Sequence, residues 1–364
     1  MATTKTIIPA QATHPGTLIK DELDAVPELN QRKLAKELDV KPSFLNEIIK
    51  GKRPVTADIA ILLEKTLGIS ADYWMKFQSQ YEIDKARVKQ KNIKKIKNIE
   101  LWSIIKEYVP VLYFKKFGYL KEDIEKDIES IKTIYNVNSI DGLVTSFSKN
   151  KYAFYRKSEK LKINEKNMFA WSSLAEYEAK NQKINTFNFD NLNQLCLNLN
   201  TIFYENKNTI ERVKEVLNQF GVKMLLIDKL EKTPIDGFSF WSDNNPAIAL
   251  TLRYNRIDNF AFTIMHEIAH IDLHLKKDRN QKFLDLTKKE NIDKCEKEAD
   301  QYAQENLISK ICWNDIIENY LPLNDNKIKE IGDKYKINPA ILLGRISYEM
   351  NYYAMQTSID KKMN

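Results

Sequence analysis

The segment NQRKLAKELDVKPSFLNEIIK, residues 30–50, has the periodicity of two short helices separated by a tight turn. Asn30 can cap the first helix, because its side chain can accept a hydrogen bond from a free backbone N–H of the first turn. Asp39 and the residue after it form the turn. Apolar residues fall where two such helices need a shared core, namely at Leu34, Ala35, Leu38, Val40, Leu45 and Ile48. The segment therefore predicts a helix-turn-helix.

The outward face of the second helix is polar and suits DNA. If this helix enters a major groove, its outward side chains can hydrogen-bond to base edges or phosphates. These positions are Lys41, Ser43, Asn46, Glu47 and Lys50. Three neighbours are expected to contact the DNA backbone: Gln31, Lys52 and Arg53. The alternative is a helical hairpin with an ordinary solvated face.

Two flanking stretches carry a family resemblance. HPGTLIKDEL (residues 14–23) and GKRPVTADIAILLEKTLGISADYWMKFQ (residues 51–78) resemble the HigA antitoxin branch of the Xre/lambda-repressor helix-turn-helix proteins, over about residues 12–82. The resemblance implies a homodimer on a palindromic operator in its own promoter, which represses its own operon and neutralises a HigB-like toxin. Asp39 departs from the glycine common in the family, but Asp tolerates a left-handed backbone.

Composition narrows the class of protein. A chain of 364 residues predicts two or three domains, and nine glycines with ten prolines favour a mainly helical protein. No apolar stretch approaches the roughly 20 residues that span a bilayer, so we expect a cytoplasmic protein without a membrane partner. The three cysteines form no CxxC pair, which argues against a disulfide framework and a cysteine-based zinc site.

The middle of the chain is less informative. Residues 84–98 hold seven basic residues and one acidic residue, most of the net charge of +7. We interpret this segment as a linker or a solvated helix, with phosphate contact as the alternative. Aromatic residues at helical spacing in residues 101–144 are expected in a core. The aliphatic run at 221–230 and the alternating runs at 237–242 and 247–252 predict a small antiparallel β-sheet.

The segment MHEIAHIDLH, residues 265–274, holds three of the four histidines. On a helix, residues four apart share a face, so His266 and His270 can bind one metal ion. Glu267 lies beside them and can act on a metal-bound water, as the catalytic base of the HExxH arrangement of zinc peptidases. The pattern indicates a Zn2+ site. The alternative is an amphipathic helix rich in imidazole.

A catalytic zinc requires a third protein ligand. On a straight helix His274 lies about 12 Å from His266 along the axis, so it is expected to support the ligands or the fold rather than to bind the ion. In EKEADQYAQENLI (residues 296–308), Glu296 is the expected ligand, and Asp300, one turn later, can orient a ligand histidine. Glu298 is the competitor, and a solvated acidic helix is the alternative.

These stretches, with NPAILLGRISYE (residues 338–349), resemble the ImmA/IrrE metallopeptidases over about residues 195–350. The resemblance implies a zincin-like domain in which His266, Glu267, His270 and Glu296 build the site, and a peptidase that cuts helix-turn-helix repressors. Here both parts lie in one chain, which leaves the substrate open.

The expected fold is mainly α with a small antiparallel sheet (α+β). We predict a DNA-binding domain at 1–83, a basic linker and helical connector at 84–190, and a zinc-peptidase domain at 191–364. The predicted function is an antitoxin-type regulator whose peptidase domain senses or executes regulatory proteolysis. The alternatives are a gluzincin-like zinc endopeptidase acting on another protein, and a metal-bound sensor domain without proteolysis.

Overall fold

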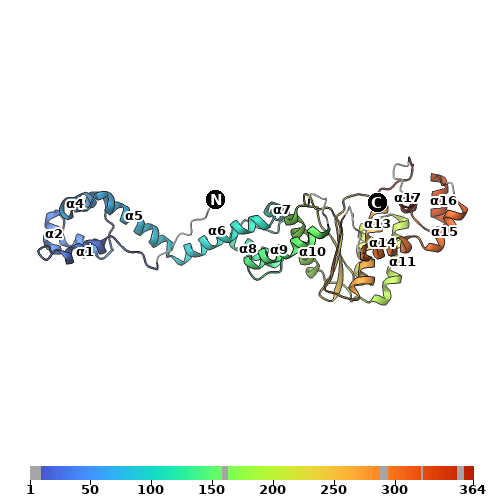
Figure 1. Cartoon of the computed structure of the whole chain (residues 1–364), viewed down its shortest axis with the longest axis horizontal. Coiled ribbons are helices and arrows are strands. Elements are labelled where there is room, and N and C mark those ends of the chain that lie inside the picture. Colours follow the sequence, from blue (N-terminus) through green and yellow to red (C-terminus); the bar gives the residue numbers. More distant parts are fainter. Residues whose placement is uncertain (1–9, 158–162, 287–293, 321–322, 351–355) are drawn as a thin grey trace. The chain divides into compact units, whose positions relative to one another are not determined.

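The computed structural model describes residues 10–157, 163–286, 294–320, 323–350 and 356–364. The chain divides into two compact units, Met1–Trp102 and Ser103–Asn364. Figure 1 traces its elements from the N-terminus in blue to the C-terminus in red. No helix in the described residues combines the length and the apolar character needed to cross a lipid bilayer.

The first unit is a helical domain built around the predicted helix-turn-helix. Its helices are α1 (Gly16–Ala25), α2 (Gln31–Glu37), α3 (Pro42–Ile49), α4 (Ala57–Leu67) and α5 (Ala71–Arg87). Asn30 caps α2 by accepting a 3.0 Å hydrogen bond from Lys33 N, and Asp39 takes a left-handed φ of 50° in the turn. The predicted core residues Leu34, Ala35, Leu38, Leu45 and Ile48 are buried together with Trp74, while Val40 packs against them at the edge.

A glycine brings α1 against the end of α3. A Cβ atom at Gly16 would lie 2.1 Å from the carbonyl oxygen of Ile48, so no larger residue fits there without a shift of the backbone. Gly16 N also donates a 2.9 Å hydrogen bond to His14 Nδ1. The start of α1 therefore packs directly against the C-terminal end of α3.

A helical stretch follows α5; it begins within the first unit and continues into the second. It consists of α6 (Gln90–Tyr108), α7 (Val111–Lys116), α8 (Ile124–Ile134), α9 (Ile140–Lys157) and α10 (Glu165–Asn181). The basic segment 84–98 forms the end of α5 and the start of α6, and its lysines are exposed. Trp102, Phe114 and Tyr135 are buried, as expected for the aromatic residues of this region. Residues 158–162 lie outside the described part.

The sheet of the second unit is mixed rather than purely antiparallel. Its strands are β1 (Lys223–Leu226), β2 (Ile235–Ser242), β3 (Asn245–Leu250) and β4 (Lys282–Leu286), in the order β1-β3-β2-β4. The expected antiparallel pairing holds for β2 with β3 and with β4. However, β1 runs parallel to β3, because the chain crosses over to β2 between them.

Helices cover both faces of this sheet (Figure 1). Along β2, Phe238 points to α10, where its ring lies 6.2 Å from Trp171, whereas Ser239 points to α13 (Ile257–Ala269) and contacts Glu267. This alternation is the normal period of a strand. Although α10 lies in the stretch that we interpreted as a connector, it packs on the sheet within the second unit.

The remaining helices enclose α13. They are α11 (Leu192–Glu205), α12 (Thr209–Gln219), α14 (Lys294–Leu307), α15 (Lys310–Asn319), α16 (Asp325–Tyr335) and α17 (Pro339–Glu349). Buried residues of α13 such as Ile264 and Ile268 share one core with Leu199 of α11 and Leu343 of α17. The helix that carries the histidines is therefore held on several sides.

Candidate DNA interface and metal centre

The outward side chains of α3 are available to a partner. Lys41, Ser43 and Lys50 are exposed, as are Lys52 and Arg53, while Asn46 is half-buried. The helix is held from behind by Leu45 and Ile48, which are fully buried. A rigid helix with polar outward residues is the arrangement that reads base edges in a major groove.

Three of the predicted DNA-contacting side chains also make contacts within the protein. Gln31 Nε2 donates a 3.4 Å hydrogen bond to Pro42 O and so links the starts of α2 and α3. Arg53 forms an ion pair with Glu47 and lies over the Phe44 ring, 5.2 Å from its centroid. Since Glu47 and Arg53 neutralise each other, Lys41, Lys50 and Lys52 carry the positive charge of this surface.

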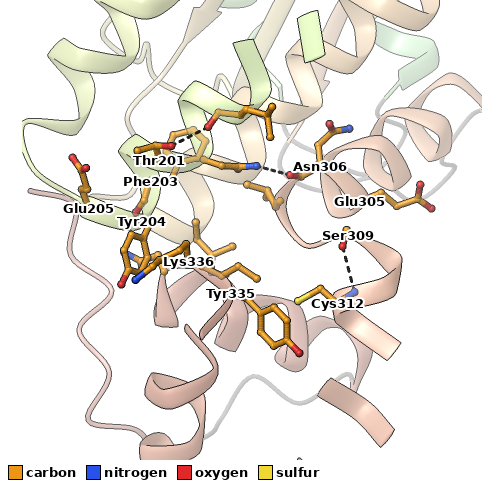
Figure 2. A pocket seen from close by; sticks show the side chains of 16 residues that line it. Thr201, Phe203, Tyr204, Glu205, Glu305, Asn306, Ser309, Cys312, Tyr335 and Lys336 are labelled. Atoms are coloured by element: carbon orange, nitrogen blue, oxygen red, sulfur yellow. Dashed lines mark hydrogen bonds between the residues drawn. The ribbon is translucent and has the colours of Figure 1, made fainter. Parts of the chain in front are cut away.

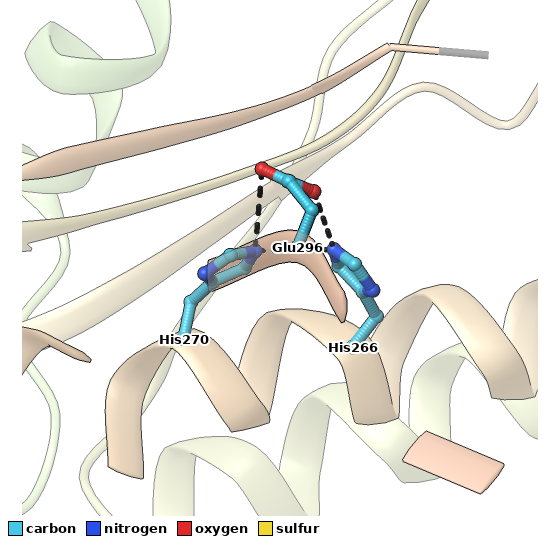
Figure 3. A group of neighbouring side chains, drawn as sticks. All are labelled: His266, His270 and Glu296. Carbon is cyan, nitrogen blue, oxygen red and sulfur yellow. Dashed lines mark hydrogen bonds and ion pairs between the residues drawn. The ribbon is translucent and has the colours of Figure 1, made fainter. Parts of the chain in front are cut away.

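The second unit brings the two histidines of the HExxH segment together with Glu296 of α14 (Figure 3). The Nε2 atoms of His266 and His270 lie 3.1 Å apart. Glu296 places one carboxylate oxygen 3.3 Å from His266 Nε2 and the other 3.8 Å from His270 Nε2. Both imidazoles are fully buried and Glu296 is 6% exposed. Two imidazole nitrogens and a carboxylate that converge in a buried space form a donor set suited to a metal ion.

Neighbouring side chains orient both imidazoles from outside. His266 Nδ1 lies 2.8 Å from Asp300 Oδ1, and His270 Nδ1 lies 3.0 Å from His274 Nδ1. The ring of His270 also stacks on Phe283 of β4, with ring centroids 4.4 Å apart. Burial alone would lower the pKa of His266, but its hydrogen bonds to Asp300 and Glu296 outweigh this effect and raise the pKa to about 10.

The expectation of a straight α-helix is wrong beyond His270. Residues His270–Leu275 form a π-helix, which has a wider turn. His274 lies beside the outer nitrogen of His270, and its own Nε2 is 3.1 Å from Glu298. Glu298, the competitor of Glu296, thus pairs with His274 and does not approach the two facing Nε2 atoms.

Glu267 lies between α13 and β2 and is fully buried. Its Oε2 accepts a short hydrogen bond from Ser239 Oγ, while Oε1 has no hydrogen-bond partner. A Cβ atom at Gly237 would lie 2.0 Å from Oε1, so glycine is required opposite this carboxylate. Burial, with a smaller contribution from the charge of Asp285, raises the pKa of Glu267 to about 8, although nearby His266 and Ser239 act to lower it. A carboxyl group in this state can both accept and donate a proton near neutral pH.

Sequence reasoning missed three residues around Glu267, namely Gly237, Ser239 and Asp285. The alternation of β2 could have placed Gly237 and Ser239 on one face, because they are two residues apart. Asp285 required β4, whose short alternating run KFLDL was not recognised as a strand.

A separate cavity of about 600 Å3 lies at the other end of α14 (Figure 2). Glu305, Asn306 and Ser309 border it, together with Phe203 and Tyr204 of α11. Asn200 donates a 2.7 Å hydrogen bond to Asn306 O across its wall. None of the histidines lines this cavity, and neither does Glu296.

Comparisons with known proteins agree with both parts of this description. Residues 28–74 match the helix-turn-helix family, and residues 217–347 match the IrrE N-terminal-like domain. Virulence-associated protein I of Dichelobacter nodosus is 35% identical over 82 residues, which cover 22% of this chain and 76% of that protein. Virulence-associated protein A' of the same organism is 41% identical over 71 residues, or 19% of this chain and 61% of that protein. This chain therefore spans less than two thirds of the second relative.

Two solved structures are similar to a quarter of the chain. An addiction module antidote protein of the HigA family from Coxiella burnetii is 32% identical, covers 24% of this chain and 92% of its own, and has a TM-score of 0.23. The antitoxin HigA of Pseudomonas aeruginosa, solved with the higBA promoter, is 32% identical, covers 24% of this chain and 91% of its own, and has a TM-score of 0.22.

The fold, the exposed face of α3 and the family matches together define a DNA-binding transcriptional regulator with a peptidase-like second domain. The chain belongs to the Xre-type helix-turn-helix family and carries an IrrE N-terminal-like domain. Both expected resemblances are confirmed.

Proposed function

We propose that this protein is an antitoxin-type autorepressor, which binds a palindromic operator in its own promoter as a homodimer. The observation that carries the proposal is the exposed polar face of α3, held rigidly by a buried core on its other side. Proteins with this arrangement usually dimerise so that two recognition helices meet successive major grooves. A HigB-like toxin encoded beside this chain is the proposed partner.

Footprinting of the purified full-length protein on its own promoter tests the DNA-binding half. The double variant Asn46→Ala, Lys50→Ala removes two proposed contacts, so we expect specific binding to weaken by about 10- to 100-fold. Lys65→Ala, an exposed lysine on α4, is the matched control and should bind normally. Unchanged protection by the double variant at the same salt concentration would refute the role assigned to α3.

We also propose that the second unit holds Zn2+ through His266, His270 and Glu296. The donor set supports zinc because two imidazoles and one carboxylate leave a fourth position open. A zinc ion held there would supply Lewis acidity to a water molecule and a peptide carbonyl. Asp300 would accept a hydrogen bond from the N–H at His266 Nδ1 and so hold this imidazole with Nε2 directed inward.

In this proposal Glu267 is the general base and acid. Its buried carboxylate can take a proton from the attacking water and pass it to the leaving amine. Ser239 holds one oxygen of Glu267, which leaves Oε1 for this transfer. Gly237 leaves room for that oxygen. The site would thus sense or execute a cleavage that changes repression.

Two other activities of the same site compete with regulatory proteolysis. One is a zinc endopeptidase that cleaves another protein, for which the helix-turn-helix serves only for docking. The other is a metal-bound sensor without proteolysis, which is favoured by the complete burial of His266, Glu267 and His270 in the described structure. A peptide needs access to these groups, whereas an ion alone does not.

Two incubations distinguish these activities. In one, the zinc-loaded protein is bound to its operator DNA; in the other, it is mixed with the product of the neighbouring gene. Regulatory proteolysis predicts a cut in the regulator or its partner, together with release of the DNA. Both effects must be lost in Glu267→Gln while zinc content is retained. Cleavage of a partner without any effect on DNA binding would favour the endopeptidase. Stoichiometric zinc without cleavage would favour the sensor.

A further inference from the structure

A second group of metal-ligating side chains adjoins the first and includes Asp285 of β4. Ligand atoms of His266, Glu267 and Asp285 all lie within 4.8 Å of one another. His266 is the only residue common to the two groups. The role proposed above for the histidines leaves Asp285 without a function.

The register of the sheet creates this second group. Gly237 of β2 pairs with Asp285 of β4, so the two residues lie side by side on the face that α13 covers. Glu267 reaches the sheet at the same level, with Oε1 against the glycine. The missing side chain of Gly237 thus lets a carboxylate from the helix approach a carboxylate from the edge strand.

Two observations indicate that this position takes a cation. Glu267 is fully buried, and its Oε1 has no hydrogen-bond partner. An unpaired carboxylate oxygen in the interior is costly, and a second carboxylate within a few ångströms adds like-charge repulsion. A divalent cation between the two carboxylates removes both penalties.

The chemistry of this position differs from that of the histidine site. His266 Nε2 faces His270 and Glu296, and its Nδ1 faces Asp300. The ring therefore has no further nitrogen to offer, so the remaining donors are the carboxylate oxygens of Glu267 and Asp285, with water. Such oxygen donors suit hard cations such as Mn2+ or Mg2+ better than zinc.

We propose that Glu267 and Asp285 hold a second, weaker divalent cation of the hard, oxygen-preferring class beside the zinc position. Its occupancy would engage the carboxylate of Glu267 and so block that residue from accepting a proton. This regulatory consequence rests on the proposed function, whereas the cation site itself does not.

Titration of the zinc-loaded full-length protein with Mn2+ tests the site, because the electron paramagnetic resonance signal of free Mn2+ reports how much ion is bound. We expect the wild type to take up one Mn2+ per chain. Asp285→Asn should lower the Mn2+ affinity by about tenfold or more while zinc content and melting temperature are retained. Asp243→Asn is the matched control: it removes the charge of a mostly exposed aspartate directly after β2, which lies 3.6 Å from Lys223 Nζ and belongs to neither metal group. Glu267→Gln is a second variant that should also lose Mn2+.

The outcome is separable from that of the histidine site, because His270 belongs only to the first group. His270→Ala should lose zinc and keep Mn2+, whereas Asp285→Asn should lose Mn2+ and keep zinc. If both variants kept their zinc while Asp285→Asn still lost Mn2+, the proposed zinc site would be refuted and the second cation site would stand. Absence of Mn2+ uptake by the wild type, or uptake unchanged in both Asp285→Asn and Glu267→Gln, would overturn the second cation site.

Discussion

The two candidate sites of this chain are built in opposite ways. The DNA-facing surface comes from one continuous stretch, residues 31–53, whose polar side chains are mostly exposed. The candidate metal centre is assembled from β2, α13, β4 and α14, and its histidines, Glu267 and Glu296 are fully or almost fully buried. A local surface depends on its own two helices, whereas the buried centre depends on strand register and helix packing throughout the second unit.

This contrast has energetic consequences. Exposed charges such as Lys50 and Lys52 contribute little to stability and are free to meet a phosphate. Buried carboxyl groups such as those of Glu267 and Glu296 are costly to ionise unless they are paired or bind a cation. We therefore expect substitutions in the first site to change DNA affinity alone, and substitutions of the proposed zinc ligands to change both zinc content and stability.

Loss of a histidine ligand should have the largest effect. His266→Ala removes one ligand nitrogen and leaves Asp300 without its imidazole partner, so we expect zinc content to fall from one ion per chain to none. The stabilisation by bound zinc, about 2.7 kcal/mol when free zinc exceeds its dissociation constant 100-fold, should be lost with it. Elemental analysis and thermal melts with and without zinc measure these effects.

The same variant tests the independence of the two sites. Because the two units have separate cores, DNA affinity of His266→Ala without zinc should match that of the wild type without zinc. Cys312→Ser, which removes a thiol outside the metal groups, is the control and should keep its zinc. If DNA affinity fell in His266→Ala but not in Cys312→Ser, the two sites would not be independent.

A smaller loss of stability is expected when Gly237 is replaced by a residue with a side chain. In Gly237→Ala the new methyl group meets Oε1 of Glu267, and the helix or the carboxylate must move. We expect the free energy of unfolding to fall by about 1–3 kcal/mol, as for other overpacked cores. Denaturant melts measure it. Gly142→Ala in α9, where the nearest atom would be 3.4 Å away, is the matched control; an equal loss in both variants would contradict the assigned role of Gly237.

A phosphate contact should have a modest effect that depends on salt. If Lys52 meets the DNA backbone, Lys52→Ala removes one released counterion, so the slope of log affinity against log salt should become shallower by about 0.9. The reduction should be the same for operator and unrelated DNA. Fluorescence anisotropy at several salt concentrations measures both slopes, and an unchanged slope would remove Lys52 from the interface.

The smallest expected effect is a loss of stability of the first unit at acidic pH. Burial lowers the pKa of His14 below its ordinary value of 6.5, and the charge of Lys85 lowers it further. Neutral His14 accepts the hydrogen bond from Gly16 N, and the Tyr81 ring lies edge-on to its imidazole. The charge of Glu82 and a backbone hydrogen bond at Arg53 oppose the shift and raise the pKa of His14, but burial and Lys85 outweigh them. As pH falls below 6.5, His14 takes up a proton more readily in the unfolded chain than in the folded unit. Its contribution to stability is therefore fully present above pH 6.5 and is lost as pH falls through the lower pKa of His14 in the folded unit.

Thermal melts across this range check the sign. The wild type should lose more stability on acidification than His14→Asn, in which the titrating group is absent. A loss that is equal in the two proteins would show that His14 contributes nothing to the acid sensitivity.

The sequence predicted the local site more completely than the assembled one. Helical periodicity in residues 30–50 was enough for the cap at Asn30, the turn at Asp39 and the buried face, because all of these are contacts between near neighbours. The spacing of His266 and His270 predicted that the two imidazoles share a face for the same reason. The period of a second helix put Glu296 and Asp300 on successive turns, but it left Glu298 open as the competing ligand.

The rest depended on contacts that no local pattern encodes. Asp285 approaches Glu267 only because β4 pairs with β2 in one register, and a shift by one residue would turn it to the opposite face. The parallel crossing of β1, the packing of α10 on the sheet and the π-helix at His270 are likewise set by tertiary packing. Periodicity alone could not have predicted them.

X-ray absorption spectroscopy of the zinc-loaded full-length protein is the sharpest test of the proposed zinc ligands, because it reports the atoms bound to the ion. We predict two imidazole nitrogens, with carboxylate or water oxygens, at about 2.0–2.1 Å from the zinc ion. A sulfur contribution near 2.3 Å, or a spectrum with oxygen neighbours alone, would contradict the assignment of His266, His270 and Glu296 as the zinc ligands.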